Sequence, residues 1–318
     1  MRGLLFACIG SIGLYLGLFG WILDRPLGLG MFRGRIDSAI ARGVADSPKL
    51  VVIAGSNAPF SHRCETMEPL IDRPCINAGV AVGIGLDYLF ARWRAVLRSG
   101  DWVYLPLEDA QYTRTRAANT LGPDAAILFR HDRATLAAFP LDRQLSAAFA
   151  FDLRSAVMSI LEMTLVAARF VDPRAEATPS NAWGDRIGHT ADRASGYRAR
   201  LDQMESRAVR PEAIAAGYGA DVVADFLAWA RAQGVVVIGG LPTGFDDSPG
   251  HAEATAAIQT FFETHATRFL ALPNRSRYPR SAFFDSPDHL HEDAQIAHSR
   301  VVARGLVALM AATPAATR

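Results

Sequence analysis

Short apolar runs alternate with longer stretches of helical periodicity along most of the chain. Runs rich in β-branched or aromatic residues and bounded by turn residues predict buried strands. Strands are predicted at 50–54, 75–77, 102–107, 235–238 and 269–272. Helices are predicted between and after them, at 61–72, 86–98, 210–232, 250–266 and 292–312. Such alternation predicts an α/β domain with a parallel sheet and helices on both of its faces.

The regular alternation is interrupted over 109–205, which we interpret as an insertion of helices and loops. Residues 109–140 predict loops and short helices, whereas 146–170 predict one long apolar helix. Charges within that helix argue against a second membrane span, namely Asp152, Arg154, Glu162 and Arg169. Residues 171–205 are polar and predict an exposed excursion.

Residues 3–23 carry no charge and are long enough to cross a bilayer as a helix. No small-residue cleavage site follows them, so we expect an uncleaved transmembrane anchor rather than a signal peptide. Arginines occur on both sides of this stretch, so their count does not set its orientation. The expected organisation is an anchor at 1–23, a linker with a juxtamembrane helix at 24–48, a domain at 49–312 and a tail at 313–318.

The charge balance disfavours a nucleic-acid partner. The chain has 33 basic and 32 acidic residues, without the basic stripe that nucleic-acid binding requires. No GxGxxG, HExxH or CxxC motif occurs, so we expect neither a cofactor nor a metal. Cys8 lies in the anchor, while Cys64 and Cys75 would either pair in an oxidising compartment or remain two buried thiols.

Four residues follow predicted strands directly, and ligands of parallel sheets bind outside the carboxyl ends of the strands. These residues are Ser56, Gly79, Glu108 and Pro242. The serine has two interpretations. It either caps the helix that follows it, or it is a nucleophile, which would need a base from another loop.

Candidate bases lie near the end of the chain, in "SAFFDSPDHLHEDAQIAH". An aspartate close to a histidine can hold the imidazole in the tautomer that a serine nucleophile requires. Two pairs satisfy this description, Asp285 with His289 and Asp288 with His291. A third histidine, His298, falls on the predicted closing helix and is interpreted as structural.

Three short blocks resemble the SGNH (GDSL-type) hydrolase superfamily. They are Gly-Ser-Asn after the first strand, the glycine-rich "NAGVAVG" after the second, and Asp followed by His-Leu before the last helix. The resemblance implies a three-layer, flavodoxin-like α/β/α fold and a nucleophilic role for Ser56. It also implies that the backbone N–H groups of Ser56 and Gly79 form an oxyanion hole, and it favours His289 with Asp285 over the other pair.

One position departs from the family pattern. The third block of the family supplies an Asn side chain to the oxyanion hole, but here "YLPLEDAQY" places Glu108 at that point. Either Asn57 or Asn77 substitutes as the donor, or Glu108 binds something else, or catalysis is impaired. Glu108 would alternatively be a structural carboxylate that caps the following turn.

The resemblance to membrane-anchored members of the family implies a serine esterase or O-acyltransferase. Its substrate would be the O-acyl groups of an exported polysaccharide or envelope glycan. The domain would face the periplasm or exterior from the inner membrane, beside an envelope protein partner. A non-catalytic scaffold or glycan-binding subunit of an export complex is the alternative. A soluble cytoplasmic esterase is disfavoured by the uncharged N-terminal stretch.

Overall fold

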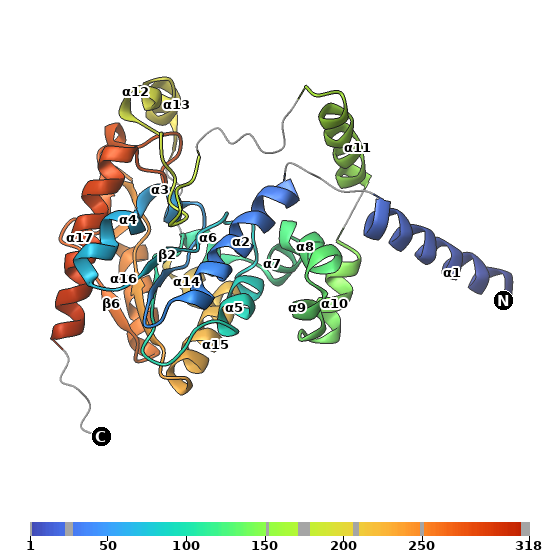
Figure 1. Ribbon diagram of the computed structural model, residues 1–318, viewed down its shortest axis with the longest axis horizontal. Helices are drawn as coiled ribbons and strands as arrows, with labels where there is room; N and C mark the ends of the chain where they lie inside the picture. The colour runs from blue at the N-terminus through green and yellow to red at the C-terminus, as the bar shows by residue number, and fades with distance from the viewer. Residues whose placement is uncertain are drawn as a thin grey trace. The chain divides into compact units, whose positions relative to one another are not determined.

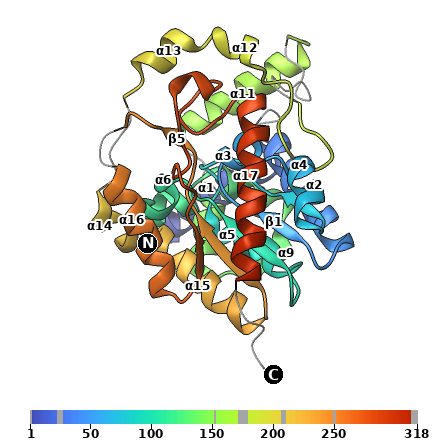
Figure 2. The same ribbon diagram turned by 90° about the vertical axis from the view of Figure 1, so that its left-hand side faces the viewer.

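The computed structural model describes residues 2–22, 28–150, 153–170, 179–205, 210–248 and 251–312 (Figures 1 and 2). The chain divides into two compact units. The first unit comprises residues 1–34, 83–91 and 116–177, and the second comprises 35–82, 92–115 and 178–318. Two helices, α2 (Gly28–Ala45) and α5 (Leu86–Arg94), contribute residues to both units.

The second unit contains a five-stranded parallel sheet in the order β2-β1-β3-β4-β6, which confirms the predicted α/β class (Figure 1). Leu50 of the central strand pairs with Cys75 on one side and Trp102 on the other. The strand order reverses between β1 and β3, and ligands of such sheets bind beside the reversal. The strands are β1 (Leu50–Val52), β2 (Cys75–Asn77), β3 (Trp102–Leu105), β4 (Val236–Gly240) and β6 (Arg268–Leu270).

Helices of the second unit pack along the sheet. The long α17 contacts α3, α4 and β6, while α15 and α16 contact β4 (Figure 2). Strand β1 is fully buried, because a parallel strand covered by helices has no face in water. The helices are α3 (Asn57–Ser61), α4 (Cys64–Ile71), α6 (Asp109–Thr113), α12 (Ala191–Ser195), α13 (Arg198–Gln203), α14 (Pro211–Ala216), α15 (Tyr218–Ala232), α16 (His251–Thr264) and α17 (Glu292–Ala311).

Two short strands and a 3-10 turn precede α17. Strands β5 (Gly244–Phe245) and β7 (Arg277–Tyr278) pair in parallel, apart from the main sheet. The turn η2 (Arg280–Ala282) follows β7. None of these three elements is predicted by the apolar pattern, because each is only two or three residues long.

Two predicted helices are each divided in the structure. The helix predicted at 61–72 is interrupted where His62 and Arg63 are extended, and α4 begins only after them. The helix predicted at 210–232 breaks at Gly217. A Cβ atom there would lie 2.1 Å from the carbonyl oxygen of Tyr112, so close backbone packing requires glycine.

The segment predicted as an exposed excursion is partly buried. Its described part, 179–205, contains Asp185 and His189, both with no exposed surface. Asp185 Oδ1 accepts hydrogen bonds from the backbone N–H of Cys64 at 2.8 Å and from the Asn77 side chain at 3.1 Å. Most of 179–205 is nevertheless exposed, as predicted, and the few buried side chains fix the segment to the domain. Residues 171–178 lie outside the described residues.

Within the first unit, α1 (Arg2–Gly17) continues into a π-helical turn, η1 (Leu18–Ile22). Residues 2–20 form the single helix in the described part of the chain that is long and apolar enough to cross a membrane. Residues 1 and 23–27, which include the expected end of the anchor, lie outside the described residues, as does the tail at 313–318. The other helices are α7 (Arg116–Thr120), α8 (Pro123–His131), α9 (Arg133–Ala137), α10 (Leu141–Ala148) and α11 (Leu153–Ala167).

The long helix predicted at 146–170 is two helices in the structure, α10 and α11. Phe149 ends α10, and its ring stacks on Tyr15 of α1 with the centroids 5.4 Å apart. The buried guanidinium of Arg143 in α10 bonds the carboxylates of Asp87 at 2.8 Å and Asp124 at 2.7 Å. These contacts hold the helices of the first unit together.

Two covalent or ionic links fasten the strands of the sheet. Cys64 and Cys75 form a disulfide that joins α4 to β2. Lys49 Nζ donates to Asp101 Oδ2 at 2.5 Å, and neither side chain has exposed surface. Asp101 Oδ1 also accepts the backbone N–H of Lys49 at 3.1 Å. Because these residues immediately precede β1 and β3, the pair holds the starts of the two central strands together.

Lys49→Met is expected to lower the free energy of unfolding by about 3–5 kcal/mol, because it leaves Asp101 buried without its cation. Urea unfolding followed by circular dichroism measures the change. The control is Arg210→Met, which breaks a pair whose side chains are 83% and 71% exposed and should leave stability nearly unchanged. Equal effects of the two substitutions would contradict the structural role of the buried pair.

Candidate active site

Ser56 lies in the turn between β1 and α3, at the edge where the strands have their carboxyl ends. It occupies the position that caps α3, but its side chain makes no capping hydrogen bond. Its Oγ instead lies 2.9 Å from Nε2 of His289. Between the two interpretations of this serine, the structure therefore places its hydroxyl beside a base.

His289 is held in a tight loop before α17. The loop closes where Phe283 pairs with Leu290 and where the Phe284 N–H donates to the carbonyl of His289 at 2.7 Å. The imidazole stacks on the ring of Phe60, with the centroids 4.1 Å apart and the planes inclined by 14°. Phe60 comes from α3, so the helix that follows the serine also orients the histidine.

Asp285 completes a chain of three residues. Its Oδ1 lies 2.7 Å from Nδ1 of His289, on the opposite side of the ring from Ser56. Burial opposes ionisation of Asp285, but its hydrogen bond with His289 and the charges of His289 and Arg200 lower its pKa below the usual value. An ionised carboxylate here keeps a proton on Nδ1, which leaves Nε2 free to accept the serine proton.

The alternative pair is not assembled in the structure. His291 caps α17, because its side chain accepts the backbone N–H of Ala294 at 3.4 Å. Asp288 lies near Glu108, and burial followed by the charge of Glu108 raises its pKa. His298 lies apart from the serine, where its Nδ1 bonds the Tyr278 hydroxyl at 2.7 Å.

Gly79 lies against the turn that carries the serine. A Cβ atom at this position would come within 2.4 Å of the Ala58 Cβ and 2.7 Å of the Gly55 carbonyl oxygen, so glycine is required. Its N–H, which the resemblance assigns to the oxyanion hole, donates to Asn77 Oδ1 at 3.2 Å. This hydrogen bond would have to open before Gly79 could bind an oxyanion.

The two asparagines weighed as substitute donors are both engaged elsewhere. Asn57 Nδ2 donates to the carbonyl of Pro106 at 2.7 Å. Asn77 Nδ2 has three acceptors, the carbonyls of Ala58 and His62 and the carboxylate of Asp185, at 3.1, 2.8 and 3.1 Å. Their amide groups fasten the loops around the serine rather than point at a substrate.

Glu108 lies against the turn that carries Ser56. Its Oε1 accepts the backbone N–H of Asn57 at 3.2 Å, and its carboxyl lies close enough to the backbone N–H of Ser56 for that group to lower its pKa. The residue begins α6 with a reciprocal capping arrangement to Gln111, so it has the expected capping role as well. Burial raises the pKa of Glu108 to about 7. The charge of Asp109 also raises this pKa, whereas the backbone N–H groups of Asn57 and Ser56 lower it.

Three carboxyl groups and one guanidinium surround this corner of the site. The charge of Asp109 raises the pKa of Glu108, and the charge of Glu108 raises the pKa of Asp288. Arg277 of β7 is the nearby cation, and its charge acts on both of these aspartates. A single cation among three buried carboxyls leaves excess negative charge, which favours keeping at least one of them protonated.

Three residues that shape the site were not singled out from the sequence: Phe60, Gln111 and Arg277. Gln111 Oε1 accepts the N–H groups of Gly55 at 3.1 Å and Glu108 at 3.0 Å, and so joins the loops after β1 and β3. Its spacing of three from Glu108 resembles a capping box, which was an available signal. Phe60 lies four residues after Ser56, the spacing that places two residues on one helix face. Nothing in the sequence marks Arg277.

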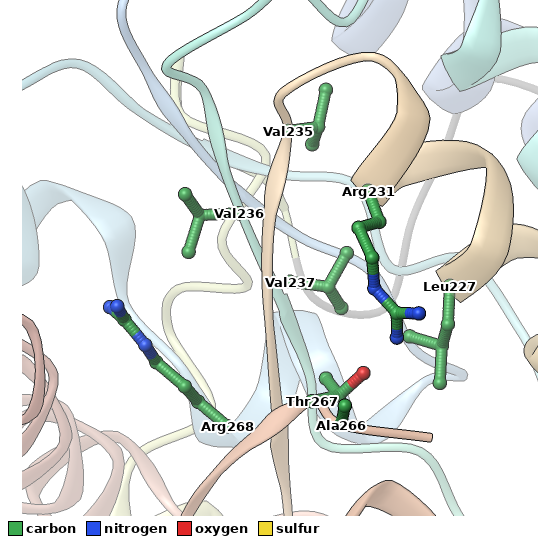
Figure 3. A pocket seen from close by; sticks show the side chains of 8 residues that line it. All are labelled: Leu227, Arg231, Val235, Val236, Val237, Ala266, Thr267 and Arg268. Carbon is green, nitrogen blue, oxygen red and sulfur yellow. The ribbon is translucent and has the colours of Figure 1, made fainter. Parts of the chain in front are cut away.

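The other chemical features lie away from the serine. Among the described residues, no group of three or more His, Cys, Asp or Glu side chains is placed to hold a metal ion. A small pocket of about 150 Å³ lies at the opposite edge of the sheet, by the amino ends of β4 and β6 (Figure 3). It is lined by Leu227, Arg231, Val235, Val236, Val237, Ala266, Thr267 and Arg268.

Comparison with protein-family models and with curated proteins identifies no relative. No family model matches the chain, and no curated protein matches it.

Proposed function

We propose that this protein is a serine esterase or O-acyltransferase of the SGNH type. One observation carries the proposal: the chain of hydrogen bonds from Ser56 through His289 to Asp285, at 2.9 and 2.7 Å. A nucleophile within reach of a base that is itself oriented by a third group is the signature of covalent catalysis. The three residues come from two loops that are more than 200 positions apart in sequence.

In the proposed reaction the Ser56 hydroxyl attacks the carbonyl carbon of an ester, and its proton passes to His289 Nε2. The C–O bond to the leaving alcohol then breaks, and the alcohol takes the proton from His289. Water or the hydroxyl of an acceptor next attacks the acyl-serine, with His289 again as the base. The first acceptor makes the protein an esterase, and the second makes it an acyltransferase.

The fold supports this assignment. The strand order β2-β1-β3-β4-β6 is that of flavodoxin-like doubly wound sheets, in which sites form beside the reversal of strand order. Ser56 follows β1 and Glu108 follows β3, the two strands that flank the reversal. We propose the three-layer SGNH arrangement on these grounds.

We further propose that α1 anchors the protein in the inner membrane, with the catalytic domain on the periplasmic or exterior side. The apolar helix at 2–20 supports the anchor. The disulfide between Cys64 and Cys75 supports the oxidising side, because disulfides persist in exported proteins and are rare in the cytosol. An anchored enzyme facing outward would meet exported or envelope polysaccharides, so their O-acyl groups are the proposed substrate.

A second candidate function is a non-catalytic scaffold or glycan-binding subunit of an export complex. The observation that favours it is Glu108, whose carboxyl accepts the Asn57 N–H and lies beside the Ser56 N–H, where the SGNH resemblance would place the oxyanion. A site permanently blocked by a carboxylate would bind a glycan without reacting. The experiments below separate the two candidates.

A fluorophosphonate probe is expected to label the full-length, detergent-solubilised protein, and Ser56→Ala is expected to abolish labelling, because the probe reacts only with an activated serine. Ser281→Ala removes an exposed serine outside the site and is the matched control, which should label normally. The same variants, incubated with O-acetylated polysaccharide, test the substrate through release or transfer of acetate. A folded wild type that neither labels nor deacylates favours the scaffold.

His289→Gln is expected to slow labelling by about 10²–10⁴-fold, the usual contribution of a general base. Asp285→Asn should also slow it, since the imidazole loses the partner that sets its tautomer. His291→Gln should leave the rate unchanged, because that side chain caps α17. Slow labelling of His291→Gln together with normal labelling of His289→Gln would reverse the assignment.

The anchor is tested by placing charge inside α1. The full-length protein is expected to stay with the membrane pellet after alkaline carbonate washing. Ile9→Lys combined with Ile12→Lys should release it, since each lysine costs about 2.5–3.5 kcal/mol near the centre of a span. The control places lysines at Val301 and Val307, which are exposed on α17, and should remain in the pellet. Protease added from either side of sealed membrane vesicles then reports which side the domain faces.

A further inference from the structure

The geometry points to Glu108 as a catalytic residue that, in its neutral form, donates a hydrogen bond to the oxyanion formed when Ser56 attacks an ester. This inference rests on the proposed serine chemistry and adds a role that the triad does not supply. It also explains how a site can work with a carboxyl group where an amide would be expected.

The position of Glu108 is tightly determined. Its carboxyl is 92% buried, and its Oε1 lies 3.2 Å from the backbone nitrogen of Asn57. A Cβ atom on Gly55 would come within 2.3 Å of the same oxygen, so the carboxyl is pressed against the turn that carries the nucleophile. The backbone N–H of Ser56 is close enough to the same carboxyl to lower its pKa.

An ionised Glu108 at this position would oppose the reaction. It would occupy the Ser56 N–H and place a negative charge beside the oxygen on which negative charge develops. A neutral carboxylic acid has the opposite effect, because its O–H is a donor while its second oxygen still accepts the Asn57 N–H. The same side chain is therefore an inhibitor when charged and a donor when neutral.

The surroundings favour the neutral form near neutral pH. The charge of Asp109 acts on Glu108, and the charge of Glu108 acts on Asp288 in the loop before α17. His289 and Arg277 of β7 in turn act on Asp288, and Arg277 also acts on Asp109. Burial raises the pKa of Glu108 to about 7, with the charge of Asp109 as a further cause. Burial and the charge of Glu108 likewise raise the pKa of Asp288. Two neighbouring buried carboxyls do not both ionise readily, so one proton is retained between them.

The step balances without any additional reactant. The Ser56 Oγ–C bond forms, the carbonyl π electrons move onto oxygen, and the hydroxyl proton goes to His289 Nε2. Glu108 donates a hydrogen bond to the new oxyanion and keeps its own proton throughout. When the carbonyl re-forms and the leaving alcohol departs with the proton from His289, Glu108 is unchanged.

The test is the pH dependence of p-nitrophenyl acetate hydrolysis by the full-length protein. Because the donor form of Glu108 exists below its folded pKa, the wild-type rate is expected to fall about tenfold per pH unit above about pH 7. Glu108→Gln should abolish this alkaline fall, since an amide donates at every pH. Glu108→Ala should lower the maximal rate by about 10²–10³-fold, as loss of an oxyanion donor does.

Two further variants separate a catalytic role from a structural one. Asp288→Asn removes a negative charge that faces Glu108, so the alkaline fall should move to lower pH. Glu212→Gln changes a carboxylate that is 71% exposed and should leave the profile unchanged. An alkaline fall that persists in Glu108→Gln, or a wild-type rate in Glu108→Ala, overturns the inference.

A readout that does not depend on turnover completes the test. Infrared difference spectra of wild type against Glu108→Gln should show the C=O band of a protonated carboxyl at about pH 6, below the folded pKa. The absence of that band overturns the inference even if Ser56-dependent hydrolysis is found. The absence of Ser56-dependent hydrolysis at every pH overturns the proposed function, and this catalytic role with it, whatever the infrared spectrum shows.

Discussion

The arrangement of the site depends on the buried ion pair between Lys49 and Asp101. These residues immediately precede β1 and β3, and their link accompanies the pairing of Leu50 with Trp102. With that register, Ser56 in the loop after β1 lies beside Glu108 in the loop after β3. A shift of one residue would turn every side chain of a strand to the opposite face, and the two loops would no longer meet.

The sheet was predictable because its strands are short runs of buried apolar residues between turn residues. The predicted and observed strands agree within three residues at every end. The interruptions of helices were not predictable, since they depend on distant contacts such as the packing of Gly217 against Tyr112. The few buried positions within 179–205 were not predictable for the same reason: Asp185 is satisfied by partners more than 100 positions away.

The site was predictable to the extent that motifs mark it. Ser56 was marked by its position after the first strand, the resemblance to SGNH hydrolases favoured His289 with Asp285, and the structure brings the three together. The engagement of Asn57 and Asn77, by contrast, is decided by carbonyl groups on other segments. The state of Glu108 depends on burial and on two neighbouring carboxyls, which no local pattern of residues reports.

The outer edge of β2 has a consequence for how copies of this protein can associate. The two N–H groups of β2 that point away from β1 already have acceptors, Glu68 Oε2 for Cys75 at 2.9 Å and the Trp183 carbonyl for Asn77 at 2.9 Å. An edge strand with satisfied N–H groups offers no template for pairing with another chain. Crowding of this protein on a surface therefore would not extend its sheet through β2, which protects it from polymerising along that side.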